Sequence, residues 1–166
     1  DQVREVLGLE FLGNASAVEN GTVAEVAPTS ANARRLVSSA SSIATHVIDH
    51  PLSSFAETLR STRLAIDLGL PGLNRARVVG IVSALPGEGK STISTNLSQL
   101  LANQGAKVLL IDADIRNPGA TRTLGRHAPE GLLEVLLEGR DMHDVLLRDA
   151  RTQLSFLPTI VKQRVP

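Results

Sequence analysis

A glycine-rich turn between an apolar run and an amphipathic segment constrains this chain more than any other stretch. Residues 78–82 read Val-Val-Gly-Ile-Val, which has the length and β-branching of a buried strand. The turn at residues 84–91 reads Ala-Leu-Pro-Gly-Glu-Gly-Lys-Ser, and the apolar residues at 93, 97, 100 and 101 then follow with the spacing of one helix face. A glycine-rich turn from a buried strand into a helix is the setting of a phosphate-binding loop.

Each part of this loop has its own role in holding phosphate. Gly87 and Gly89 lack a Cβ, so the backbone can turn its N–H groups towards an anion. The start of the next helix adds unpaired N–H groups and about half a positive charge. Lys90 should reach the β- and γ-phosphates, and the Ser91 hydroxyl should ligate Mg²⁺. We therefore expect ATP or ADP with Mg²⁺ to bind at Pro86, Gly87, Glu88, Gly89, Lys90, Ser91 and Thr92.

Two carboxylates follow a second predicted strand, at residues 107–111. A strand–helix–strand unit with a short crossover implies parallel pairing, so this strand should lie beside or near 78–82. Asp112 and Asp114 would then reach the same sheet edge as the loop, and alternation would put both on one side of the strand. We interpret the two acids as handling Mg²⁺ and the attacking nucleophile.

The remaining segments extend this α/β plan. Helices are predicted at 131–139 and 141–148 and a third strand at 153–158. The fold class is therefore α/β, with a P-loop NTPase-like parallel sheet flanked by helices. Residues 1–50 are expected to form a loosely packed, linker-like segment before a domain at 51–166. Within that segment the sequence predicts a short strand after Gly8, a strand at 22–26 and a helix over 32–49.

A helix is also predicted over 53–68, because Pro51 stops the preceding segment and Ser54 with Glu57 forms a capping-box pattern. Steps of three residues place Glu57, Arg60 and Arg63 on one broad surface of this helix. The charge pattern itself fits either a solvated face, with Glu57 engaged by its own cap, or a contact surface.

Composition excludes several classes of function. The 17 basic residues balance 17 acidic ones, so nothing in the charge argues for a nucleic acid partner. The chain has no cysteine for a disulfide framework, and no apolar stretch approaches the roughly 18 residues of a membrane span. His127 and His143 have no partner at metal-ligand spacing, so we expect them at the surface.

Three motifs, taken together and in order, resemble the bacterial tyrosine kinases, the cytoplasmic modules of capsule and exopolysaccharide co-polymerases. They are Glu-Thr-Leu-Arg-Ser-Thr-Arg at 57–63, the loop at 84–91, and Leu-Leu-Ile-Asp-Ala-Asp-Ile-Arg at 109–116. The resemblance covers residues from about 50 to the end, and the opening also looks like the segment after the family's second membrane helix.

The resemblance implies an ATP-dependent protein-tyrosine autokinase that regulates polysaccharide polymerisation and export. It gives Lys90, Asp112 and Asp114 catalytic roles and makes Ser91, Asp112 and Asp114 the Mg²⁺ ligands. Phosphoryl transfer requires mainly alignment and neutralisation of charge, and Asp112 is the favoured acceptor of the phenolic proton.

The same resemblance implies partners. Glu57, Arg60 and Arg63 would mediate ring-like self-association, and the substrate would be a tyrosine in the tail of a neighbouring subunit. The machinery served would be a membrane-embedded polysaccharide exporter, at the cytoplasmic face of the bacterial inner membrane.

Two departures from the family leave alternatives open. The family carries a further Asp on a later strand and a tyrosine cluster, and this chain has neither, so we expect the chain as given to be inactive as a kinase. We expect a kinase domain incomplete at the C-terminus, because a three-stranded sheet would expose an apolar edge. The alternatives are a nucleotide-binding assembly module without kinase activity and a partition or division-site ATPase. Leu85 followed by Pro86, where those ATPases carry a signature lysine and then glycine, speaks against the latter.

Overall fold

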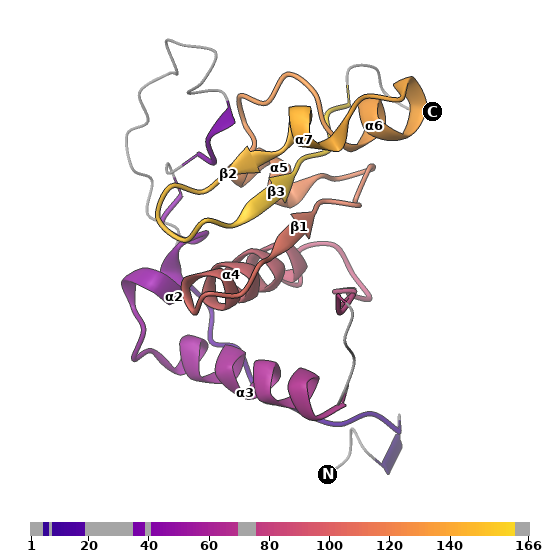
Figure 1. Ribbon diagram of the computed structural model, residues 1–166. Coiled ribbons are helices and arrows are strands. Elements are labelled where there is room, and N and C mark those ends of the chain that lie inside the picture. The colour runs from indigo at the N-terminus through magenta and orange to yellow at the C-terminus, as the bar shows by residue number, and fades with distance from the viewer. Residues whose placement is uncertain (1–4, 7, 19–34, 39–40, 70–75, 162–166) are drawn as a thin grey trace.

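The computed structural model describes residues 5–6, 8–18, 35–38, 41–69 and 76–161. Helix α4 lies between helix α3 on one side and a three-stranded sheet on the other (Figure 1). The helices are α2 (His46–Asp49), α3 (Ser54–Gly69), α4 (Lys90–Asn103), α5 (Gly119–Leu124), α6 (Leu132–Glu138) and α7 (Met142–Val145). The strands are β1 (Leu109–Ile111), β2 (Leu147–Arg148) and β3 (Ser155–Leu157). In the described part, no helix is both long enough and apolar enough to span a bilayer.

The sheet is mixed, with strand order β1-β3-β2. β1 pairs with β3 in parallel, Leu110 opposite Phe156, in keeping with the parallel sheet of the predicted fold class, although the sequence named no partner for the third strand. β2 runs antiparallel to β3, Leu147 opposite Phe156. The helix predicted over 141–148 is therefore wrong beyond Val145, because Leu147 is buried by pairing with β3.

The strand predicted at residues 78–82 is wrong as well. The structure assigns no strand there, and Val78 and Val82 are about nine-tenths exposed. The predicted parallel pairing of this run with the strand at 107–111 does not form, since β1 pairs with β3. A strand is stabilised by hydrogen bonds and side-chain packing with a neighbouring strand. β-Branching and length alone could not supply that neighbour for 78–82.

Two separate apolar clusters pack against opposite faces of α4. Phe55, Ala56 and Leu59 of α3 pack with Val47 of α2 against Leu97 and Leu100. On the sheet side, Leu110 and Phe156 pack with Ala102 of α4, and with Leu124 of α5. Because α4 is covered on both faces, its first residue is fixed relative to both α3 and the sheet.

The segment before α3 is more ordered than the expectation of loose packing. Ala44 and Val47 are 2% exposed, and the Val47 N–H donates to the Asn96 side chain of α4. The helix predicted over 32–49 is α-helical among the described residues only at His46–Asp49, in keeping with the serine-rich run before it, which forms helix poorly. Residues 9–12 form no strand, and the strand predicted at 22–26 lies outside the described residues.

The helix predicted over 53–68 is confirmed as α3, although its cap differs from the prediction. The Ser53 hydroxyl accepts a hydrogen bond from the Ala56 N–H, at 3.2 Å, so Ser53 caps the helix. Ser54 is the first helical residue, and its hydroxyl contacts that of Ser16. Glu57 is consequently free of the capping role and pairs with Arg60.

Candidate functional site

The glycine loop runs directly into α4. Gly87 and Gly89 have φ angles of 85° and 83°, in the left-handed region that residues with a Cβ seldom adopt. Gly89 immediately precedes the first helical residue, Lys90. The loop is also closed on itself, since the Leu85 N–H donates to Glu88 Oε2 at 2.9 Å. The two glycines therefore occupy the positions where the predicted phosphate loop needs them.

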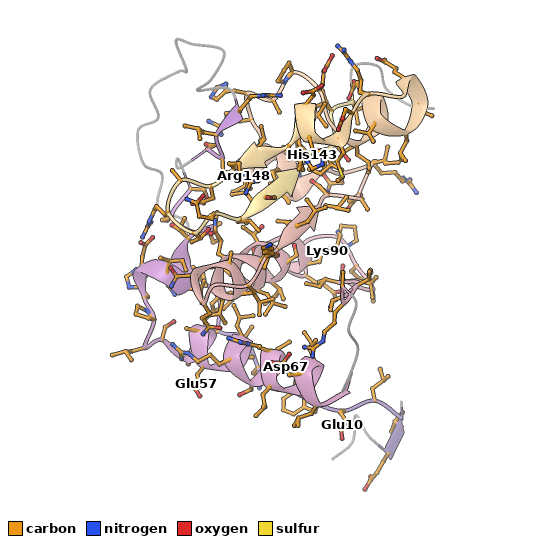
Figure 2. The ribbon with its side chains drawn as sticks, in the orientation of Figure 1. Glu10, Glu57, Asp67, Lys90, His143 and Arg148 are labelled. Atoms are coloured by element: carbon orange, nitrogen blue, oxygen red, sulfur yellow. The ribbon has the colours of Figure 1, made fainter. Side chains whose placement is uncertain are left out.

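Lys90 points towards the acids at the end of β1. Its Nζ lies 3.2 Å from Asp114 Oδ2, and each side chain is 27% exposed. Figure 2 shows Lys90 beside the end of α4 and far from Glu57 and Asp67 of α3. The structure thus brings together the loop lysine and one of the two predicted acids.

Asp112 has different surroundings. It is 7% exposed, and its Oδ2 accepts hydrogen bonds from the Thr121 N–H and from the Thr121 hydroxyl, both at 2.8 Å. Its Oδ1 faces the Asp114 N–H at 3.3 Å. The Thr159 hydroxyl donates to the Asp112 carbonyl, and the Thr159 N–H donates to the Thr121 hydroxyl. Asp112 therefore ties β1 to α5 and to the chain after β3.

The carboxylate of Asp114 is held in its charged form. Burial raises the pKa of Asp114, but hydrogen bonds from the Asn117 N–H and from Lys90, with the positive charges of Lys90 and Arg122, lower it below its ordinary value. The two acids, equivalent by spacing, thus differ in the structure. Asp112 is buried and both of its carboxylate oxygens accept hydrogen bonds, and Asp114 is partly accessible and paired with a cation.

Ser91 sits against the loop that leads into α5. A Cβ placed on Gly119 would clash with the Ser91 hydroxyl, so the backbone approaches that side chain closely. The same point is 3.8 Å from Arg122 Nη2. The Ser91 hydroxyl and Arg122 consequently lie close together at Gly119, and the charge of Arg122 acts on Asp114.

The residues present fit a magnesium ion that is shared with phosphate. Mg²⁺ prefers oxygen ligands in octahedral geometry, and it usually keeps several waters and takes one or two protein carboxylates. Ser91 and Asp114 offer a hydroxyl and an accessible carboxylate, whereas both carboxylate oxygens of Asp112 already accept hydrogen bonds. In the described ranges, no group of three or more His, Asp or Glu side chains could hold a metal by itself.

The charged residues of α3 are divided between two contacts. Glu57 Oε2 pairs with Arg60 Nη1 at 2.8 Å, and Arg60 also donates to the Pro51 carbonyl. Arg63 instead donates to the Gln104 side chain after α4 and lies 3.5 Å from Asp67. The Glu57 side chain is 72% exposed and remains accessible to another molecule.

Two site residues were missed by the sequence reasoning. Thr121 anchors Asp112, and Arg122 contributes charge beside Asp114. Both lie on α5, a short helix that was not predicted, and nothing in their spacing marked them. Of the two histidines expected at the surface, His143 is exposed and His127 is half-buried.

Sequence comparison shows which known proteins this chain resembles. The family of CobQ/CobB/MinD/ParA nucleotide binding domains matches residues 79–163. The succinoglycan biosynthesis transport protein ExoP of Rhizobium meliloti is 46% identical over 112 residues, which cover 68% of this chain and 14% of that protein. The tyrosine-protein kinase YwqD of Bacillus subtilis is 37% identical over 107 residues, 64% of this chain and 45% of that protein.

A further relative is the tyrosine-protein kinase CpsD of Streptococcus agalactiae, 37% identical over 84 residues, 50% of this chain and 37% of that protein. The chain thus spans less than half the length of each of these three relatives. Their names confirm the resemblance to bacterial tyrosine kinases that the three sequence motifs indicated, and the family match confirms the α/β P-loop fold class. With half of its residues matched, the chain belongs to the family of CobQ/CobB/MinD/ParA nucleotide binding domains.

Proposed function

We propose that this chain is the nucleotide-binding part of an ATP-dependent protein-tyrosine kinase that regulates exopolysaccharide or capsule polymerisation and export. The observation that carries the proposal is the contact between Lys90 at the end of the glycine loop and Asp114 after β1. Support comes from relatives named as tyrosine-protein kinases and as a succinoglycan biosynthesis transport protein.

In this proposal the loop N–H groups and Lys90 bind the phosphates of ATP, and Ser91 and Asp114 hold Mg²⁺. Mg²⁺, when bound, would neutralise the charge that develops on the phosphates during transfer. Lys90 then exchanges its contact with Asp114 for a phosphate oxygen. Asp114, released from Lys90, would then be available to the metal and to the acceptor hydroxyl.

The surroundings of the two acids favour a division of roles that differs from the one expected from sequence. A proton acceptor must come within hydrogen-bonding reach of the attacking hydroxyl. Asp112 is buried with Oδ2 bound twice by Thr121, so it orients the loop and α5. Asp114 is accessible and is our candidate for the group that receives the phenolic proton.

The wider assignments rest on the resemblance. Glu57, Arg60 and Arg63 of α3 would contact a neighbouring subunit, whose tail would supply the acceptor tyrosine, since this chain contains none. The site of action would be the cytoplasmic face of the bacterial inner membrane, beside the polysaccharide export machinery.

Transfer of labelled phosphate from [γ-³²P]ATP to a tyrosine-containing acceptor polypeptide tests the kinase proposal. We expect label on tyrosine with a full-length kinase that contains this chain, and none when its Lys90 is replaced by methionine. Tight ATP binding without transfer to any tyrosine acceptor would favour the alternative, an assembly module that binds nucleotide but performs no chemistry.

A further inference from the structure

Arg122 is a cation beside the glycine loop that the loop pattern does not include. It lies on α5, thirty-one residues after the loop's serine, Ser91. Its Nη2 is 3.8 Å from the point where a Cβ on Gly119 would stand, and the Ser91 hydroxyl contacts that same point. Two polar groups from separate elements therefore converge at Gly119.

The guanidinium of Arg122 is available for a ligand. Across the described ranges, its side chain makes no hydrogen bond or ion pair within the protein, and the residue is exposed. Its charge nevertheless acts on Asp114, the carboxylate that holds Lys90. An arginine offers up to five N–H donors in a planar fork that matches the oxygens of a phosphate group.

The position of Arg122 also indicates which phosphate of the nucleotide it would bind. The loop N–H groups are expected to hold the inner phosphates, Lys90 to reach the β- and γ-phosphates, and Ser91 to ligate the metal. Arg122 lies near Ser91 and acts on Asp114, the two residues that are proposed to hold the metal. A cation in that position would contact the terminal phosphate of ATP, and ADP would offer it no such phosphate.

We propose that Arg122 binds the γ-phosphate of ATP and so makes this site prefer ATP to ADP. The inference deepens the proposed function, on which it rests, by adding a specificity-determining residue. While ATP is bound, Lys90 and Arg122 would grip the terminal phosphate from two elements, α4 and α5.

Arg126, four residues further along and just after the end of α5, is the matched control. Both arginines line the same pocket of about 280 Å³ together with Thr121, Gly125 and Ile160. The three atoms nearest to a Cβ on Gly119 include Arg122 Nη2 and none of Arg126. The two substitutions remove the same charge from the same pocket, and only one removes it from beside Ser91.

Calorimetric titration of ATP and of ADP, each with Mg²⁺, into the chain and its Arg122→Ala, Arg122→Lys and Arg126→Ala variants tests the proposal. For Arg122→Ala we expect ATP affinity to fall about tenfold while ADP affinity stays within about twofold. Arg122→Lys should recover part of the loss, and Arg126→Ala should resemble the parent.

Equal weakening of ATP and ADP by Arg122→Ala, or an equal loss of ATP affinity in Arg126→Ala, would overturn the inference. Melting temperatures of all variants should match the parent, because both side chains are exposed. A parent chain that binds neither nucleotide would instead overturn the proposed function itself, and the two failures are thereby distinguished.

Discussion

Lys90 Nζ lies 3.2 Å from Asp114 Oδ2, which joins the first residue of α4 to the loop after β1. The contact balances the cation of the glycine loop with a carboxylate. A bound phosphate must compete with Asp114 for this cation, and the displaced carboxylate is then beside any metal on that phosphate. Nucleotide binding would therefore also release Asp114 for its role at the site.

Removing the charge of Asp112 should destabilise the fold. In Asp112→Asn, either orientation of the amide would set its N–H₂ against an N–H donor, from Thr121 or from Asp114. A buried group left without its partner costs about 1–3 kcal/mol. Asp114→Asn, which loses a partly exposed ion pair, should cost about 1 kcal/mol or less.

Urea unfolding of the two variants checks this division of roles. The midpoint should fall clearly for Asp112→Asn and little for Asp114→Asn. The reverse order, or an Asp112→Asn chain as stable as the parent, would show that Asp112 is not the anchor described here. Thr121→Val should reproduce part of the Asp112→Asn loss, because it removes one of the two hydrogen bonds to Oδ2.

Acid should weaken the connection between α2 and the turn before β3. Burial raises the pKa of Asp49, but hydrogen bonds from Arg151 and Thr45, with the charges of Arg151 and His50, lower it overall. A carboxyl whose pKa is lower in the folded state stabilises the fold above its unfolded-state pKa of about 4. That contribution is lost as pH falls through the folded pKa.

The Asp49 side chain is 37% exposed, so solvent screening limits the effect to about 0.2–1 kcal/mol. We expect the parent to lose this stability between about pH 4 and the lower folded pKa, and Asp49→Asn to lack that part of the pH dependence. Urea unfolding at pH 7 and at pH 3 measures the difference. A parent-to-variant gap that is the same at both values would contradict the assignment.

The α3 surface can be tested by its effect on association. If Arg60 and Arg63 contact a second subunit, truncating them should cost about 2–5 kcal/mol of binding energy. Sedimentation velocity over a range of concentrations should then show smaller species for Arg60→Ala/Arg63→Ala than for the parent chain.

Arg140→Ala is the control for this test, because Arg140 also forms an exposed ion pair with a glutamate, Glu130. It lies after α6, away from α3. If the parent, the double variant and the control are all folded and sediment alike, the contact proposal is wrong. The α3 charges then form only a solvated face, whose ion pairs stabilise the fold by a few tenths of a kcal/mol.

Sequence was most informative where one local rule decides the structure. The left-handed glycines before Lys90 and the helix after them follow from backbone sterics and periodicity, and both are present in the structure. Sequence reasoning failed where the structure of a segment depends on pairing with a distant part of the chain. Residues 78–82 have a strand's composition but no paired neighbour, and Leu147 joins β3 although its local pattern favoured a helix.

The two acids illustrate the same limit. Strand alternation treats Asp112 and Asp114 as equivalent, and only the arrival of Thr121 from α5 separates them. The sequence did not identify Arg122 for a related reason, because its place beside Ser91 depends on how the chain turns through Gly119.

The most direct test of the central claim is the thermal response to Mg²⁺·ATP in the parent chain and in Lys90→Met. Ligand at 100 times its dissociation constant should stabilise the parent by about 2.7 kcal/mol. Lys90→Met should lose most of this stabilisation while its melting temperature without nucleotide stays close to the parent's, because the lysine faces Asp114 and not the apolar clusters. An unchanged nucleotide response in Lys90→Met would contradict the account, since the phosphates would then bind elsewhere.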